Sequence, residues 1–255
     1  MKTQEVMALY DQYERKEYEI PGWEKFATAQ VVKVVSPDMD GSFIAYFELS
    51  EEQANIVIDK EVAFFTRLGK SFEWKTYDSD QPENIGVMLL QKGFVAEEPE
   101  SFMALDLASC ELPEPQMLCA EVTDEEGIRD AMRVKQELRG EACQAQLLHL
   151  IETKRQDPAS IRIYVVYQDG TPVSSAWITF NADSPFAGIW GGSTLPEYRG
   201  RGCYQALLKQ RIRDAKLAGK QYLIIDASAM SRPIVEKYGF ELIATTTPYL
   251  FQSNY

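Results

Sequence analysis

The sequence predicts an α/β protein with a mixed, α+β-type sheet, divided into two domains. Three observations support this prediction. Residues 108–118 contain two prolines and no hydrophobic periodicity, which is typical of a linker between domains 1–107 and 119–255. The second half alternates strand and helix patterns in the order β-α-α-β-β-β-α-β-α-β. A glycine-rich turn at 199–202 leads from a strand into a long helix. Early hairpins and a later helical crossover together predict a mixed sheet.

The first half begins with a helical pattern over 1–30, interrupted at Pro21-Gly22. Strand patterns at 31–35 and 42–49 flank a turn at 36–41 and predict a hairpin. Ser50 with Gln53 is a capping box that starts a helix through Leu68. A strand at 72–77, a helix from 82 to about 93 and a strand at 102–107 complete this half.

The second half begins with a strand at 119–122 and a helix capped at Thr123 or Asp124 that runs to 138. A second helix is expected from about 142 to 154, followed by a hairpin of strands 161–167 and 172–181. After the strand from 186, the pattern predicts a helix at 204–218, a strand at 222–226, a short helix at 231–238 and a strand at 240–251.

Composition excludes several classes of function. The net charge of −13 argues against nucleic acid or an anionic membrane as the main partner. The first 20 residues are too charged for a signal peptide, and no apolar run approaches membrane length. The four cysteines lack CxxC spacing and His149 is the only histidine, so no metal site is expected. Reduced thiols and a cytoplasmic location are therefore expected.

The stretch from Gly191 to Tyr204 carries the main functional signal. A strand, a glycine-rich turn and a helix start leave backbone N–H groups aimed at one point, where an anion is stabilised. From Arg199 to Lys220 there are seven basic residues and one acidic residue, within an acidic chain. The alternative is an ordinary turn before a solvated basic helix.

The element order and two motifs resemble the GNAT superfamily of acetyl-CoA-dependent N-acetyltransferases over about 119–255. The first motif is Arg/Gln-x-x-Gly-x-Gly/Ala, which Arg199 and Gly202 match, whereas Tyr204 replaces the small residue. The second ends in Glu-Lys-x-Gly-Phe and is matched by residues 236–240. The resemblance implies a GNAT-like fold and transfer of acetyl from acetyl-CoA to a primary amine of a small molecule or peptide by direct attack.

The same resemblance implies roles for individual residues. The backbone of Ser193, Thr194 and Leu195 is expected to pair with the pantetheine arm of CoA. The expected pyrophosphate contacts are Arg199, Gly200, Arg201, Gly202, Cys203 and Tyr204, and Ser228 is a further expected cofactor contact. Val235 stands where the family often has a tyrosine. Tyr238 or Tyr204 is therefore expected to protonate the CoA thiolate, and Asp226 or water to accept the amine proton.

The first half resembles a degenerate copy of the second. Each half has a strand, a helix and then Gly-Phe, at 93–94 and at 239–240. Glu48, Glu51 and Glu52 stand where a phosphate turn would lie, and their charges would repel a pyrophosphate. Only the second half is therefore expected to bind CoA. The alternative is an unrelated α/β domain.

Two other functions remain open from the sequence. One is a non-catalytic CoA-binding or regulatory module, indicated by Val235 and by the lack of a carboxylate on residues 189–194. The other is a nucleotide-binding protein, but Gln205 stands where Gly-x-Gly-x-x-Gly requires a third glycine. The acidic charge favours a cationic acceptor, and a homodimer is left open.

Overall fold

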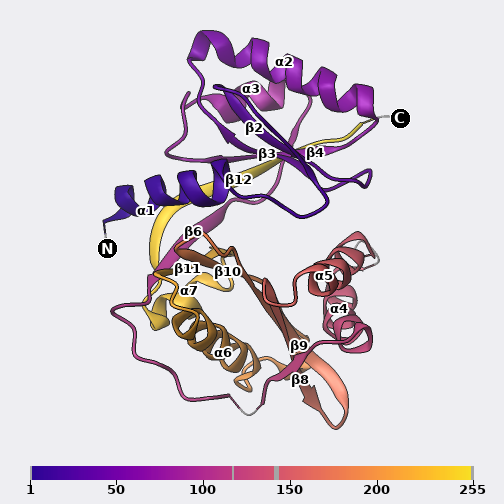
Figure 1. Ribbon diagram of the computed structural model, residues 1–255, viewed down its shortest axis with the longest axis vertical. Helices are drawn as coiled ribbons and strands as arrows, with labels where there is room; N and C mark the ends of the chain where they lie inside the picture. The colour runs from indigo at the N-terminus through magenta and orange to yellow at the C-terminus, as the bar shows by residue number, and fades with distance from the viewer. Residues whose placement is uncertain (1, 117, 141–143, 254–255) are drawn as a thin grey trace. The chain divides into compact units, whose positions relative to one another are not determined.

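The computed structural model describes all residues except 1, 117, 141–143 and 254–255. The chain divides into two compact units (Figure 1). The first unit contains 1–103, 226–232 and 242–255, and the second contains 104–225 and 233–241. The expected boundaries, 1–107 and 119–255 around a linker, therefore do not coincide with this division. The C-terminal strand contributes to the N-terminal unit, because it pairs there with a strand of the first half.

The first unit is built on a mixed sheet in the order β1-β2-β3-β4-β12, with β5 paired to β12. The β3–β4 pair is parallel, and the other pairs of this sheet are antiparallel. Its elements are α1 (Thr3–Tyr10), the π-helix η1 (Asp11–Lys16), β1 (Glu24–Ala27), β2 (Val31–Val35), β3 (Ser42–Phe47), α2 (Glu51–Leu68), β4 (Phe72–Tyr77), α3 (Ile85–Gln91), β5 (Val95–Ala96) and β12 (Glu241–Phe251).

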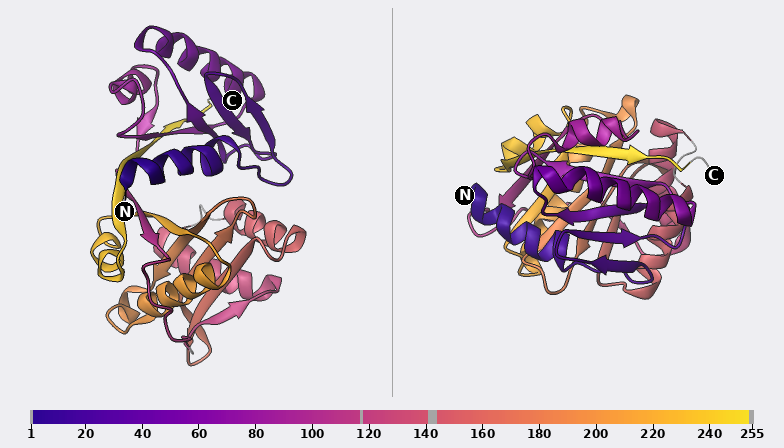
Figure 2. Two further views of the ribbon diagram at one scale, coloured as in Figure 1. Left: turned by 60° about the vertical axis from the view of Figure 1, so that its left-hand side comes forward. Right: turned by 90° about the horizontal axis from the view of Figure 1, so that it is seen from above.

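The core of the first unit lies between this sheet and the helices α2 and α3 (Figures 1 and 2). Phe65 of α2 and Trp74 of β4 are both fully buried in it. The helix α2 ends at Gly69, whose φ of 65° is the left-handed conformation that glycine adopts without strain. The expected capping box and glycine stop of this helix are thus confirmed, as is the hairpin of β2 and β3.

The second unit has a sheet in the order β11-β10-β9-β8-β7. The β10–β11 pair is parallel because α6 crosses between these strands, and the other pairs are antiparallel. Its elements are β7 (Ala120–Val122), α4 (Glu125–Arg139), α5 (Gln144–Gln156), β8 (Ile161–Gln168), β9 (Thr171–Phe180), β10 (Phe186–Thr194), the 3₁₀ helix η2 (Pro196–Tyr198), α6 (Cys203–Leu217), most of β11 (Tyr222–Ala227), part of α7 (Arg232–Val235) and the 3₁₀ helix η3 (Glu236–Tyr238). The strand β6 (Glu100–Asp106) begins in the first unit and ends in the second.

Helices cover both faces of the second sheet. Ile163 and Val165 of β8 belong to a core cluster with α4 and α5, whereas Tyr164 between them bonds Asp214 of α6. Alternate residues of a strand point to opposite faces, so α6 lies on the face opposite α4 and α5, as Figure 1 also shows.

Some expected elements differ from the structure. Residues 24–27 form an edge strand and not a helix, and α3 begins three residues after Pro82. The first residues of the expected helix at 142–154, and the Cys143 thiol, lie outside the described residues. The other three cysteines are free thiols. Within the described part of the chain, no helix is both long and apolar enough to span a bilayer, and no group of acidic, cysteine or histidine side chains could hold a metal ion.

We expect Thr247→Pro to loosen the first unit selectively. Asp78 N–H donates to Thr245 O, and donors alternate along an antiparallel strand, so Thr247 also points its N–H at β4. Pro248 occupies the alternate position, where no donor to β4 is needed. Losing the Thr247 donor should cost about 1–3 kcal/mol of stability, because a buried acceptor of β4 loses its partner, and should speed amide hydrogen exchange in residues 72–77, measured by mass spectrometry. Faster exchange in 161–180 instead would contradict the assignment of β12 to the first unit.

Candidate functional site

A β-bulge interrupts β10 in the second unit. Trp190 pairs with Trp177 and Ser193 pairs with Ser175, so two glycines of β10 oppose a single residue of β9. A bulge of this kind breaks the hydrogen-bond ladder and turns backbone groups away from the neighbouring strand. The backbone of Gly191 and Gly192 is therefore available to a ligand.

Both bulge positions require glycine, for different reasons. Gly191 has a φ of 63°, and a Cβ there would lie 1.9 Å from the Trp177 ring. A Cβ on Gly192 would lie 2.8 Å from the ring of Tyr204 in α6. The Trp177 side chain packs in the core cluster of α4 and α5, and Tyr204 belongs to the helix on the other face. The bulge is thus held between two aromatic rings.

Just before the bulge, β10 separates from β11. The parallel register covers only three pairs, from Phe186↔Tyr222 to Gly188↔Ile224. On its other side β10 remains bonded to β9, where Leu195 N–H donates to Val173 O at 3.0 Å. Ser193 and Thr194 therefore have no partner in the β10–β11 register, on the side of β10 that faces β11. An extended ligand could add to this edge as a strand does.

The turn that follows ends at the N-terminus of α6. Gly200 and Gly202 have φ values of 72° and 83°, and nothing lies within 4 Å of a Cβ built on either. The first bond of α6 runs from Ala206 N–H to Gly202 O, and no side chain caps the helix. The N–H groups of residues 203–205 therefore have no acceptor in the helix, and they form an anion cradle with open space before it.

The fit of this cradle to CoA is chemical as well as geometric. Arg199 and Arg201 flank the turn and are exposed, and Arg199 Nε donates to Thr194 O at 3.2 Å. A pyrophosphate binds where N–H donors at a helix start are free, arginines balance its charge and no Cβ blocks its approach. The residues present thus fit the diphosphate of CoA.

All the expected cofactor residues except Ser228 lie on neighbouring segments of the second unit. Ser193, Thr194 and Leu195 follow the bulge, and 199–204 form the cradle. Tyr204 packs against the bulge through Gly192. Tyr238 is half-buried in η3 of the same unit, and burial raises the pKa of its phenol, which keeps it protonated at neutral pH.

Asp226 and Ser228 belong to the first unit. Asp226 Oδ2 accepts from Lys75 Nζ at 2.6 Å, whereas the buried Oδ1 has no hydrogen-bond partner among the described residues. Burial alone would lower the pKa of Lys75, but Asp226 raises it well above its ordinary value. Ser228 is exposed, and its hydroxyl lies 3.2 Å from that of Ser231.

The first unit repeats the strand arrangement without the cradle. Its parallel pair β3–β4 also covers three residues, Ser42↔Phe72 to Ile44↔Trp74. The helix that follows β3 starts with a capping box, in which Ser50 N–H donates to Gln53 Oε1 at 3.3 Å. Glu51 and Glu52 fill its first turn. A helix start that is capped and acidic does not attract an anion.

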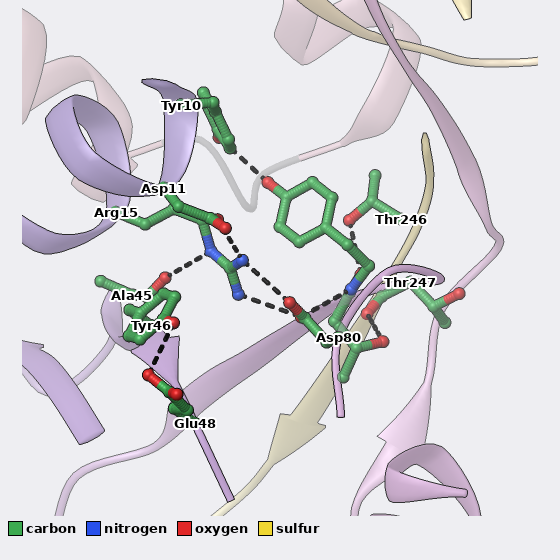
Figure 3. Close-up of polar contacts among 11 residues, drawn as sticks. Tyr10, Asp11, Arg15, Ala45, Tyr46, Glu48, Asp80, Thr246 and Thr247 are labelled. Carbon is green, nitrogen blue, oxygen red and sulfur yellow. Dashed lines mark hydrogen bonds and ion pairs between the residues drawn. The ribbon is translucent and has the colours of Figure 1, made fainter. Parts of the chain in front are cut away.

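A buried arginine also fills the space beside β3 (Figure 3). Arg15 is 3% exposed, and its Nε donates to Ala45 O at 3.0 Å, one residue beyond the last β3–β4 pair. Its Nη1 and Nη2 donate to the Asp80 carboxylate at 2.9 and 3.0 Å. Burial raises the pKa of Asp80, and Arg15 opposes that shift. The Arg15 guanidinium thus occupies the Ala45 carbonyl, which lies beyond the last residue pair of β3 and β4.

Sequence reasoning missed three features of these sites. They are the aromatic rings against Gly191 and Gly192, the insertion of Arg15 and the burial of Arg211. Each depends on side chains that are distant in sequence. Only Arg211 carried a signal, since it follows Tyr204 by seven residues and so lies on the same helix face, among apolar positions.

We expect Arg15→Met to destabilise the first unit by about 3–5 kcal/mol, because it leaves the Asp80 carboxylate buried without its partner. Urea unfolding followed by circular dichroism measures this loss. Arg15→Met/Asp80→Asn should regain part of the stability, since a neutral amide needs no counter-charge. The control is Arg129→Met, which breaks an exposed pair with Glu125 and should cost less than about 1 kcal/mol. Equal losses in Arg15→Met and Arg129→Met would contradict the role given to Arg15.

Comparison with known proteins supports this description. Residues 126–240 match the model of the Acetyltransferase (GNAT) family. A GCN5-related N-acetyltransferase from Kribbella flavida has a TM-score of 0.68 at 16% identity, with 98% of this chain and 95% of that chain covered. A putative GNAT-family acetyltransferase from Novosphingobium aromaticivorans has a TM-score of 0.58 at 18% identity, with 90% of this chain and 92% of that chain covered.

A tandem GNAT protein from the clavulanic acid biosynthesis pathway has a TM-score of 0.56 at 12% identity, with 93% of this chain and 86% of that chain covered. No curated protein matches the sequence. At these identities the structures establish the fold alone. Residues 126–240 match the GNAT family model, in a chain that has a GNAT-type fold over nearly its whole length.

Proposed function

We propose that the second unit binds acetyl-CoA and transfers its acetyl group to a primary amine of a small molecule or peptide. The observation that carries this proposal is the uncapped start of α6, preceded by two glycines of positive φ and flanked by Arg199 and Arg201. We infer that the first unit binds no CoA, because its corresponding helix is capped and Arg15 lies beside β3.

The backbone of the second unit would do most of the binding. The N–H groups of 203–205 would hold the pyrophosphate, and Arg199 and Arg201 would balance its charge. The uncovered edge of β10 at 193–195 would pair with the amides of the pantetheine arm, as an added strand does. The arm would then bring the thioester to the bulge at Gly191 and Gly192.

In the reaction, the amine nitrogen bonds to the thioester carbonyl carbon and the C–S bond breaks. The bulge N–H groups would stabilise the negative charge that develops on the carbonyl oxygen. The amine reacts in its neutral form. The sulfur leaves as a thiolate and takes a proton from Tyr238 or Tyr204, and the amine gives up one proton to water. The proton count therefore balances. The acidic chain, with a net charge of −13, favours a cationic acceptor.

A non-catalytic CoA-binding module is the second candidate. Val235 supplies no phenol at the position where the family often has one, and Lys75 engages Asp226. Turnover of acetyl-CoA against a panel of amines separates the two functions. A module would bind CoA and leave every amine unmodified.

We expect CoA to bind one site per chain by calorimetry and to raise the melting temperature, whereas NAD and ATP should not raise it. Gly202→Ala should weaken CoA binding about tenfold or more, because the new Cβ enters the cradle and strains a positive-φ position. Gly219→Ala is the matched control, since Gly219 has a φ of 72° and open space but lies at the other end of α6. The cradle assignment is wrong if the two variants bind CoA equally well.

We expect Tyr238→Phe or Tyr204→Phe to lower kcat by about 100-fold, since a lost proton donor typically costs that much. The loss should shrink when the leaving thiolate needs no proton, so an acetyl thioester of a more acidic thiol provides the control. Unchanged kcat in both variants would exclude both tyrosines as the donor and leave water in that role.

A further inference from the structure

A buried arginine lies beneath the bulge of β10. Arg211 is 1% exposed and is among the largest fully buried side chains of the described residues. It lies in α6, two turns after Tyr204, on the helix face that packs against β9 and β10. Burial lowers the pKa of the Arg211 guanidinium, and the nearby Tyr204 opposes this lowering. The charge therefore stands in a region of low dielectric.

The contacts of Arg211 join the helix to the bulge. Its Nε donates to Leu207 O at 3.0 Å within α6, and Nη1 lies 3.5 Å from Trp190 O, a long contact directed at the residue just before the bulge. Nη2 has no hydrogen-bond partner among the described residues. An unpaired buried donor is costly, so an apolar residue would serve packing alone better than arginine.

We propose that Arg211 is a positioning residue that orients and polarises the Trp190–Gly191 peptide for the acetyl carbonyl. This inference rests on the proposed function, because it assumes that an acyl thioester reaches the bulge. A trans peptide is planar, with its C=O and N–H pointing in opposite directions. A cation that attracts the Trp190 carbonyl thus directs the Gly191 N–H away from α6. It also makes that N–H a stronger donor, since hydrogen bonds in series polarise one another.

Tyr204 fits the same arrangement. Its ring lies against Gly192, at the other end of the bulge, and its phenol is close to Arg211. Tyr204 departs from the small residue of the family motif, and Gly192 provides the space for its ring. The pair Arg211 and Tyr204 therefore supports the bulge from the α6 side, whereas Trp177 supports it from the other.

The test is the infrared stretching frequency of the thioester carbonyl in ¹³C-labelled acetyl-CoA bound to the full chain. A stronger hydrogen bond lowers this frequency. Arg211→Met keeps a long apolar side chain but removes the charge, so the frequency should rise toward that of free acetyl-CoA. CoA, which has no acyl carbonyl, should bind within about twofold of wild type, because the helix N-terminus that holds its phosphates is unchanged. With an accepted amine, kcat should fall by roughly tenfold or more while the KM for acetyl-CoA changes little.

The matched control is Arg213→Met, which removes a charge from the same helix at a side chain that bonds Pro113 O and does not contact the bulge. Its carbonyl frequency should equal that of wild type. Arg211→Lys keeps the charge on a shorter side chain and should give a carbonyl frequency between those of wild type and Arg211→Met. If Arg211→Met does not fold, the frequency in Arg211→Lys decides the test. A frequency unchanged from wild type in the folded Arg211 variants overturns the inference. Failure of wild-type protein to bind either CoA or acetyl-CoA overturns the proposed function and this inference with it.

Discussion

The short parallel contact between β10 and β11 is the constraint on which the second unit depends. Three residue pairs are enough to fix the direction of both strands. Beyond them the register with β11 ends, and the bulge at Gly191 and Gly192 interrupts the register with β9. The crossover through α6 then brings an uncapped helix start to the end of the same strand. An open strand edge, a bulge and an uncapped helix start therefore follow one another along this part of the chain.

The first unit shows how the same arrangement is closed. Its parallel strands also share three pairs, but Arg15 enters beside β3 and bonds both Ala45 O and Asp80. At the start of the following helix, Ser50 N–H donates to Gln53 Oε1, and glutamates lie in the first turn. The Ala45 carbonyl and the Ser50 N–H are therefore occupied by the chain itself. This difference, more than the strand order, distinguishes the two units.

The bulge of the second unit is supported by compensating residues. Glycine at 191 admits the Trp177 ring, and glycine at 192 admits Tyr204, a residue larger than the family motif carries at that position. Arg211 then occupies the buried space behind Tyr204 at an energetic cost that packing alone does not explain. Two glycines in a strand, a large residue in the turn motif and a buried arginine are each unfavourable alone. Together they are consistent with one role, which is to maintain the bulge.

The sequence alone determined the mixed α/β architecture, most element positions and the glycine turn before α6, because hydrophobic periodicity, caps and glycine turns act over a few residues. It did not determine that β12 joins β4, since a strand pattern shows which face is buried but not which edge it will pair with. Nor did it place Asp226 beside Lys75, Arg15 beside Asp80 or Arg211 behind the bulge. Those contacts join residues that only the tertiary structure brings together, where burial makes each charge depend on its partner.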